Sequence, residues 1–221
     1  EWNVPMVIRA PYGGGIGGGL YHSQSIEALF SHIPGIKVVM PSTPEDAKGL
    51  LKSAIRDPNP VLFLEPKKGY RAIKGEVPDG EYLTPIGPAN VVRAGADLTL
   101  YAYGMMMHYA RIAAERVARE DGIEVELVDL RTLVPLDKET VISSFKKTGK
   151  ALIVYEDNKF LGYGAEIASI LAEEAFEYID GPIKRLAAPD VPGVPFSHPV
   201  QEAFMINPDK IADAIRELEA Y

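Results

Sequence analysis

The chain has 221 residues, of which 47% are hydrophobic and 24% charged, with a formal net charge of −8 at pH 7. It has no cysteine and only four, widely spaced histidines, which excludes disulfides, thiolate catalysis and cysteine-ligated zinc and disfavours a transition-metal site. This acidic chain lacks the basic clusters that are typical of nucleic-acid binders. No apolar run approaches the roughly 20 residues needed to cross a bilayer. We therefore expect an intracellular protein whose partners are proteins or small molecules, with no nucleic acid and no membrane among them.

A glycine-rich loop follows the first predicted strand, at residues 5–8. Residues 9–28 read RAPYGGGIGGGLYHSQSIEA, and the loop delivers His22 between glycines and two serine hydroxyls. Glycine lets backbone approach a ligand or a second chain closely. We expect Ser23 or Ser25 to cap a helix that has Glu27 in its first turn, with His22 immediately before it. The alternatives are a functional loop and a structural turn with His22 bonded to backbone.

The next segments read as strand, helix and strand. Residues 36–40 and 61–65 are short apolar runs that each end at a proline, as buried parallel strands do. Between them, Thr43 and Pro44 begin a helix with a hydroxyl cap and a proline in its first turn. The apolar face of that helix is predicted from helical spacing to comprise Ala47, Leu50, Leu51, Ala54 and Ile55.

A linker rich in proline and glycine, at residues 77–90, separates this half from a second one. Strands and helices then alternate with short connections, which is typical of a doubly wound α/β domain. The predicted strands are 98–103, 125–130, 151–155 and 186–188, and the predicted helices are 105–120, 138–145, 165–176 and 208–218.

Several smaller features have two readings. The run from Met105 to Met107 could form an adaptable binding surface, but core or interface packing fits it better. The basic run 67–71, KKGYR, is either an anion or partner contact or a solvated loop. The turn 162–164 is either an anion site or a tight turn. His32 is expected in a loop and His108 on a helix surface.

Five motifs in one order and spacing resemble the beta subunit of the thiamine-diphosphate-dependent decarboxylating component of 2-oxoacid (branched-chain or pyruvate) dehydrogenase complexes. The resemblance covers essentially the whole chain. The motifs are IRAPYGGG at 8–15, YHSQSIEA at 21–28, KVVMPSTP at 37–44, FLEPK at 63–67 and VDLRTLVPLD at 128–137.

This resemblance implies the fold and the domain limits. Residues 1–76 would be the later part of a pyrimidine-binding parallel-sheet domain, 77–90 the linker, and 91–221 a transketolase C-terminal-like α/β/α domain. It also implies an alpha2beta2 heterotetramer that holds thiamine diphosphate and Mg2+ between alpha and beta chains, and a lipoyl acyltransferase partner. The location would be the cytoplasm of a bacterium or archaeon, or the mitochondrial matrix of a eukaryote.

The resemblance assigns site residues one by one. His22 matches the family histidine that assists acyl transfer to the lipoyl arm. Ala54, Asp57 and Asn59 match positions whose carbonyls hold a structural K+ in some relatives, whereas Val7 stands where some relatives have a threonine at a second such site. The glutamate that binds the aminopyrimidine ring has no match, so cofactor contacts are expected upstream of Glu1, and this chain is expected not to activate the cofactor alone.

Three readings stay open at this point. The favoured one is a subunit that takes part in oxidative decarboxylation of a 2-oxoacid and passes the acyl group to lipoamide. The second is an acetoin dehydrogenase or another transketolase-superfamily subunit, which shares the same motifs. The third is a non-catalytic assembly module that makes the tetramer interface.

Overall fold

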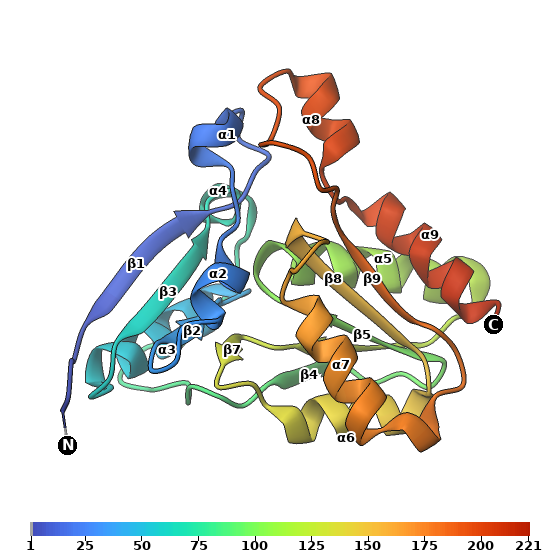
Figure 1. Ribbon diagram of the computed structural model, residues 1–221, viewed down its shortest axis with the longest axis horizontal. Coiled ribbons are helices and arrows are strands. Elements are labelled where there is room, and N and C mark those ends of the chain that lie inside the picture. Colours follow the sequence, from blue (N-terminus) through green and yellow to red (C-terminus); the bar gives the residue numbers. More distant parts are fainter. Residues whose placement is uncertain (1) are drawn as a thin grey trace.

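Two sheets organise the protein, and the structure, a computed structural model, describes residues 2–221 (Figure 1). The first sheet has the order β1-β3-β2-β7 and the second the order β4-β6-β5-β8-β9. Neighbouring strands are parallel except for β2 with β7 and β4 with β6. The α/β class is therefore confirmed. The strands are β1 Val7–Tyr12, β2 Lys37–Val39, β3 Val61–Pro66, β4 Asn90–Arg93, β5 Leu98–Ala102, β6 Val125–Asp129, β7 Thr132–Val134, β8 Ala151–Asn158 and β9 Ile183–Ala188.

Helices cover both faces of the second sheet, with α5 and α9 on one face and α6 and α7 on the other (Figure 1). Side chains alternate along β5: Leu98 and Leu100 pack with α5, whereas Tyr101 donates its hydroxyl to the carbonyl of Val141 in α6. Within residues 2–221 no helix is both long and apolar enough to span a bilayer. The helices are α1 Gly19–His22, α2 Glu27–Ser31, α3 Pro44–Arg56, α4 Gly69–Ala72, α5 Gly104–Asp121, α6 Lys138–Thr148, α7 Gly164–Glu174, the 3-10 turn η1 Phe176–Tyr178, α8 His198–Phe204 and α9 Pro208–Glu219.

The start of α3 follows the local signals in the sequence. The Thr43 hydroxyl accepts a hydrogen bond from the Asp46 amide at 3.1 Å, and Pro44 is the first helical residue. Leu50 and Ala54 are buried as predicted, but Ile55 is 64% exposed, so its place on the apolar face was wrong. Five residues beyond Leu50, Ile55 is turned well away from the face that packs on β3.

Strands β4 and β7 were not predicted from the sequence. The three residues of β7 return from the second half and pair antiparallel with β2, so that Val38 lies opposite Val134. Tyr12 and Leu62 of the first half share one buried cluster with Tyr103 of the second half. The two halves therefore have a common core and do not pack as separate bodies.

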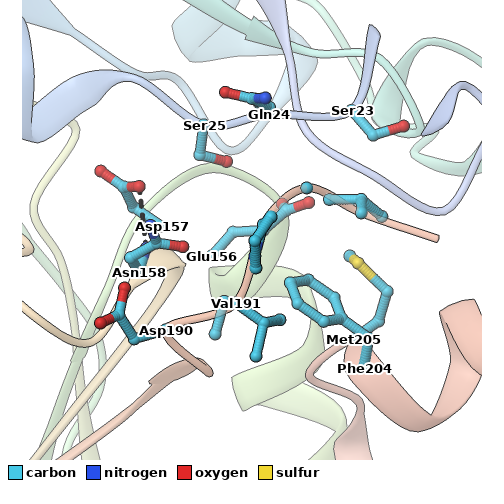
Figure 2. Close-up of a pocket in the computed structure, with 14 residues that line it drawn as sticks. Ser23, Gln24, Ser25, Glu156, Asp157, Asn158, Asp190, Val191, Phe204 and Met205 are labelled. Atoms are coloured by element: carbon cyan, nitrogen blue, oxygen red, sulfur yellow. Dashed lines mark hydrogen bonds between the residues drawn. The ribbon is translucent and has the colours of Figure 1, made fainter. Parts of the chain in front are cut away.

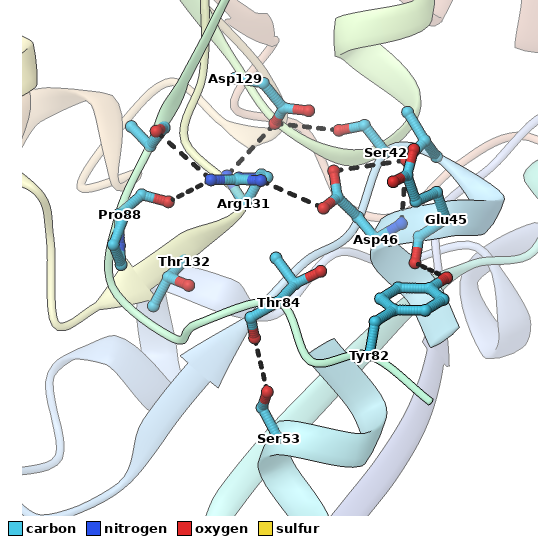
Figure 3. A network of polar contacts seen from close by, with 12 residues as sticks. Ser42, Glu45, Asp46, Ser53, Tyr82, Thr84, Pro88, Asp129, Arg131 and Thr132 are labelled. Atoms are coloured by element: carbon cyan, nitrogen blue, oxygen red, sulfur yellow. Dashed lines mark hydrogen bonds and ion pairs between the residues drawn. The ribbon is translucent and has the colours of Figure 1, made fainter. Parts of the chain in front are cut away.

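Arg131 ties the halves together through a polar network (Figure 3). Its guanidinium pairs with the Asp46 carboxylate at 3.1 Å and donates to the Pro88 carbonyl at 2.9 Å. Its backbone N–H donates to Asp129 at 3.2 Å, and Asp129 also accepts from the Ser42 hydroxyl at 3.0 Å. Burial raises the pKa of Asp129 to about 7. The Arg131 side chain thus joins α3 to the segment before β4, and its backbone N–H holds Asp129 at the end of β6.

Candidate active site

The glycine-rich loop connects β1 to α1 and lies against the second half of the chain. Gly19 has a φ of 55°, and a Cβ there would lie 2.2 Å from Cζ of Phe196. A Cβ on Gly14 would lie 2.8 Å from the Met205 sulfur. Figure 1 shows α1 beside the segment that leads into α8. The glycines are therefore needed where the loop and α1 meet residues 191–205.

His22 is the last residue of α1, and its side chain is exposed. Its carbonyl oxygen accepts a hydrogen bond from the Lys67 ammonium, which follows β3 in the sequence. The predicted position, immediately before a helix N-terminus, was wrong, because α1 ends at His22 and α2 begins five residues later. The imidazole is held by its backbone at a surface where a ligand can reach it.

The predicted serine cap was also wrong. Helix α2 begins at Glu27 with Ile26 at the N-cap position, and no side chain caps it. The hydroxyls of Ser23 and Ser25 are buried without a hydrogen-bond partner within residues 2–221. Glu27 does lie in the first turn as predicted. The two serines instead face a cavity.

That cavity, about 420 Å³ in volume, separates the residues after α1 from the second half (Figure 2). Ser23, Gln24 and Ser25 line one side, and the C-terminal end of β8 with the segment 190–194 lines the other. Glu156 of β8 accepts a hydrogen bond from the Gly14 amide at 2.6 Å. The cavity wall therefore also supports the glycine-rich loop.

Three carboxyl groups of this region are shielded from water, Glu27 fully and Glu156 and Asp157 in part. Burial raises the pKa of Glu156 to about 7, and burial followed by the nearby charge of Asp157 raises the pKa of Glu27. Burial likewise raises the pKa of Asp157. One Glu27 oxygen accepts from the Tyr103 hydroxyl at 3.0 Å, and the other has no partner within residues 2–221. Glu27 and Glu156 therefore hold a proton at higher pH than an exposed glutamate does.

The free energy of unfolding is expected to fall as pH rises from about 5 to 7, because the folded state keeps protons on carboxyls that ordinarily titrate near about 4.3. Glu156→Gln should flatten this pH dependence, since an amide oxygen can still accept from Gly14 and does not titrate. Urea unfolding at several pH values measures it. Glu81→Gln is the control, because Lys52 and Arg56 lower the pKa of the exposed Glu81 to about 2, below this window. Unchanged slopes in Glu156→Gln would contradict the assignment.

Gly19→Ala is expected to lower the free energy of unfolding by about 1–2 kcal/mol. The new Cβ meets both an unfavourable φ and the Phe196 ring. Gly17→Ala is the matched control, because Gly17 has a φ of 69° and no atom near its Cβ position. Thermal and urea unfolding of both variants compare them. Equal losses would show that backbone strain alone matters and that the Phe196 contact does not.

Ala54 lies in the last turn of α3, and Asp57 and Asn59 lie in the turn that follows, close to the N-terminal end of β3 and thus at the opposite end of that strand from Lys67. The Asp57 amide donates to the Ala54 carbonyl at 3.2 Å, and the Asn59 amide donates to the Asp57 carboxylate at 2.9 Å. Asp57 also pairs with Lys37. No group of three or more histidine, aspartate or glutamate side chains in residues 2–221 is arranged to share a metal ion.

The structure also locates the other residues that were singled out in the sequence. Met105 to Met107 are buried in the core, as predicted. His32 follows α2 and is exposed, and His108 is half-buried in α5. At Gly164 a Cβ would lie 2.3 Å from the Tyr155 ring, so close packing explains the turn 162–164.

Both halves match known sequence families. Residues 1–72 match the transketolase pyrimidine-binding domain, and residues 87–211 match the transketolase C-terminal domain. Across all 221 residues the chain is 54% identical to 2-oxoisovalerate dehydrogenase subunit beta of Bacillus subtilis, of which it covers 67%. The chain belongs to the family of 2-oxoacid dehydrogenase beta subunits. Enzymes of this family depend on thiamine diphosphate.

Other proteins are also similar over nearly the whole of this chain. The pyruvate dehydrogenase E1 component subunit beta of Acholeplasma laidlawii is 47% identical, with 99% of this chain and 66% of the relative covered. An acetoin oxidoreductase subunit beta of Bacillus subtilis is 43% identical, with 97% and 62% covered. The chain thus spans about two thirds of the length of these relatives. The predicted resemblance is confirmed, and the acetoin, other transketolase-superfamily and assembly-module readings are not favoured.

Solved structures support the fold of this beta-subunit family member. A split-gene transketolase, described as an inactive beta4 tetramer, aligns with a TM-score of 0.77 and 24% identity, covering 97% of this chain and 66% of the other. A transketolase from Pichia stipitis aligns with a TM-score of 0.69 and 17% identity, covering 99% and 30%. At such identities the likeness concerns the fold alone.

Proposed function

We propose that the chain is the beta subunit of an enzyme that oxidatively decarboxylates a 2-oxoacid and reductively acylates lipoyl groups of an acyltransferase component. The branched-chain 2-oxoacids are the preferred substrates and pyruvate is the second candidate. One observation carries this proposal: the chain is 54% identical, over its whole length, to a 2-oxoisovalerate dehydrogenase subunit beta.

Thiamine diphosphate and Mg2+ would be shared with an alpha subunit in an alpha2beta2 assembly. In open parallel sheets, ligands bind beyond the carboxyl ends of the strands, and the glycine-rich loop and Lys67 follow the carboxyl ends of β1 and β3. His22, exposed at this edge, fits a place beside the cofactor. We also propose that residues 1–76 are the later part of a pyrimidine-binding domain, 77–90 a linker and 91–221 a transketolase C-terminal-like domain.

Two carboxylates near this edge, Glu27 and Glu65, are already engaged by other side chains. Glu27 is fully buried and bonded to Tyr103. Glu65 is bound by Arg9 at 2.5 Å and by the Tyr70 hydroxyl. This supports the expectation that the aminopyrimidine contacts come from a segment that the longer relatives have upstream of the position of Glu1, so that the chain needs that segment for activity.

His22 would act on the lipoyl group. Thiamine diphosphate, when bound, supplies the carbon nucleophile that attacks the 2-oxoacid carbonyl. As one sulfur of the lipoyl disulfide takes the acyl group, the S–S bond breaks and the other sulfur leaves with the electron pair. His22 gives that sulfur a proton, which imidazole does readily near neutral pH. Lys67 holds the His22 carbonyl and thereby orients the end of α1.

A K+ ion at Ala54, Asp57 and Asn59 is a further part of the proposal. The turn offers carbonyl and carboxylate oxygens, and it lies at the C-terminal end of α3, where the helix dipole favours a cation. These donors fit K+ chemically, although Lys37 already neutralises the Asp57 carboxylate. The ion would stabilise the turn and take no part in the reaction.

For the cellular location we propose the cytoplasm of a bacterium or archaeon, or the mitochondrial matrix of a eukaryote. Relatives come from Bacillus subtilis and, as a mitochondrial protein, from Arabidopsis thaliana.

Reconstitution tests the function. The chain, an alpha subunit and the segment that precedes it in the relatives are combined with thiamine diphosphate and Mg2+, and 2-oxoisovalerate, pyruvate and acetoin are compared as substrates. We expect the highest kcat/KM with 2-oxoisovalerate and no activity when the preceding segment is omitted. A preference for acetoin would overturn the substrate class, and full activity without that segment would overturn the account of the aminopyrimidine contacts.

A further inference from the structure

Three cationic side chains lie close to one another beside α1, the helix that ends at His22. Lys67, Lys68 and Arg71 line a hollow of about 530 Å³ together with Ile16 of the glycine-rich loop and Tyr70. The hollow adjoins α1, because Lys67 also donates to the carbonyl of His22. These cations belong to the basic run 67–71, for which the sequence left open an anion or partner contact and a solvated loop.

None of the three cations is paired with a carboxylate within residues 2–221, whereas many other lysines and arginines of the chain are. The ammonium of Lys68 lies 5.4 Å from the centre of the Tyr109 ring. Two acids near these cations are engaged elsewhere: Glu156 accepts from the Gly14 amide, and Glu65 accepts from Arg9 and Tyr70. The surface is therefore locally positive on a chain of net charge −8.

Exposed apolar and aromatic side chains flank these cations. Ile16 is 44% exposed and Tyr70 is 58% exposed, and on α1 Leu20 and Tyr21 are also exposed. Tyrosine and arginine with apolar neighbours are typical of protein interfaces, and scattered lysines around them set the charge of the partner. A small anion would use the cations but leave the apolar side chains in water. A protein surface would cover both.

We propose that Ile16, Lys67, Lys68, Tyr70 and Arg71 form a docking surface for an acidic face of the protein that carries the lipoyl group. The inference rests on the proposed function, which requires a protein-bound lipoyl arm to reach His22. The occupant is assigned by charge complementarity and by the bond between Lys67 and His22, which places the surface at the mouth of the site. Docking there would deliver the arm beside the imidazole.

The test uses the reconstituted alpha–beta complex with two acceptors, the lipoyl domain of the acyltransferase and free lipoamide. Arg71→Glu is the chosen variant, since the exposed Arg71 side chain makes no hydrogen bond or ion pair within residues 2–221. We expect the ratio of kcat/KM for the domain to kcat/KM for lipoamide to fall by about tenfold. Added salt should bring the kcat/KM ratio of the variant closer to that of the parent, since the Debye length shortens from about 30 Å at 0.01 M to about 10 Å at 0.1 M. The double variant Arg119→Glu/Lys146→Glu, on remote helices, should keep the parent ratio.

Direct binding separates this inference from the proposed function. The isotopically labelled lipoyl domain is titrated with the complex, and its NMR signals are followed whether or not acylation occurs. Binding that Arg71→Glu weakens supports the surface even if no acyl transfer is seen. Absence of binding to the parent complex, equal binding by the variant, or release of the alpha subunit by Arg71→Glu would overturn it.

Discussion

Replacing His22 with alanine is expected to slow acyl transfer to the lipoyl group by about 100- to 10,000-fold, the range that positioned general acids contribute. Decarboxylation measured with an artificial electron acceptor should change far less, because that acceptor needs no proton on a lipoyl sulfur. The exposed imidazole at the end of α1 can reach a protein-bound arm, and its backbone is fixed by Lys67. Both rates are measured on the same reconstituted complex.

The matched control is His32→Ala. His32 is also an exposed histidine at the end of a short helix, but it follows α2 and lies outside the glycine-rich loop. Both rates should stay at the parent level in this variant. Equal losses of the two rates in His22→Ala would contradict the proton-transfer role and would indicate a structural one.

Arg131→Met is expected to lower the free energy of unfolding by about 3–5 kcal/mol, the cost of breaking a buried ion pair from one side. The side chains of Arg131 and Asp46 are only 13% and 11% exposed. Without the guanidinium, Asp46 loses its ion-pair partner, the carbonyl of Pro88 loses a hydrogen-bond donor, and the buried Asp129 loses a nearby positive charge. Urea unfolding at pH 7 measures the loss.

Arg56→Met serves as the control for Arg131→Met. Arg56 pairs with Glu81 where both side chains are more than half exposed, and such pairs contribute less than about 1 kcal/mol. A double-mutant cycle with Asp46→Asn should show clear non-additivity for Arg131. A loss in Arg131→Met no larger than that in Arg56→Met would contradict the view that this network joins the halves.

Local signals in the sequence were sufficient for most of the fold. The Thr43 cap and the first-turn Pro44 predicted where α3 begins, and β2 and β3 were predicted because each is a short apolar run closed by proline. Strand β7 was missed because three residues between Arg131 and Pro135 carry no periodic pattern. Its pairing with β2 depends on a contact about ninety residues away in the chain, for which no local pattern exists.

The candidate site was predicted less completely than the fold. The residues around His22 contain no helical periodicity, so α1 could not be predicted. The need for glycine at positions 14 and 19 comes from their contacts with Met205 and Phe196, which the sequence does not show. Glu156 accepts a hydrogen bond from the Gly14 amide, which lies 142 positions away in the sequence. A conspicuous acidic pair at the end of a predicted strand, Glu156 and Asp157, was the only signal that could have marked this wall of the cavity.

The central claim is that the glycine-rich loop and α1 present His22 to a cofactor shared with an alpha subunit. An experimental structure of the alpha–beta complex with thiamine diphosphate, including the residues proposed to contact the aminopyrimidine ring, tests it most directly. We predict that the imidazole of His22 faces the thiazolium side of the cofactor across the subunit boundary. A structure in which His22 points away from the cofactor cleft, or lies far from any alpha subunit, would contradict the account.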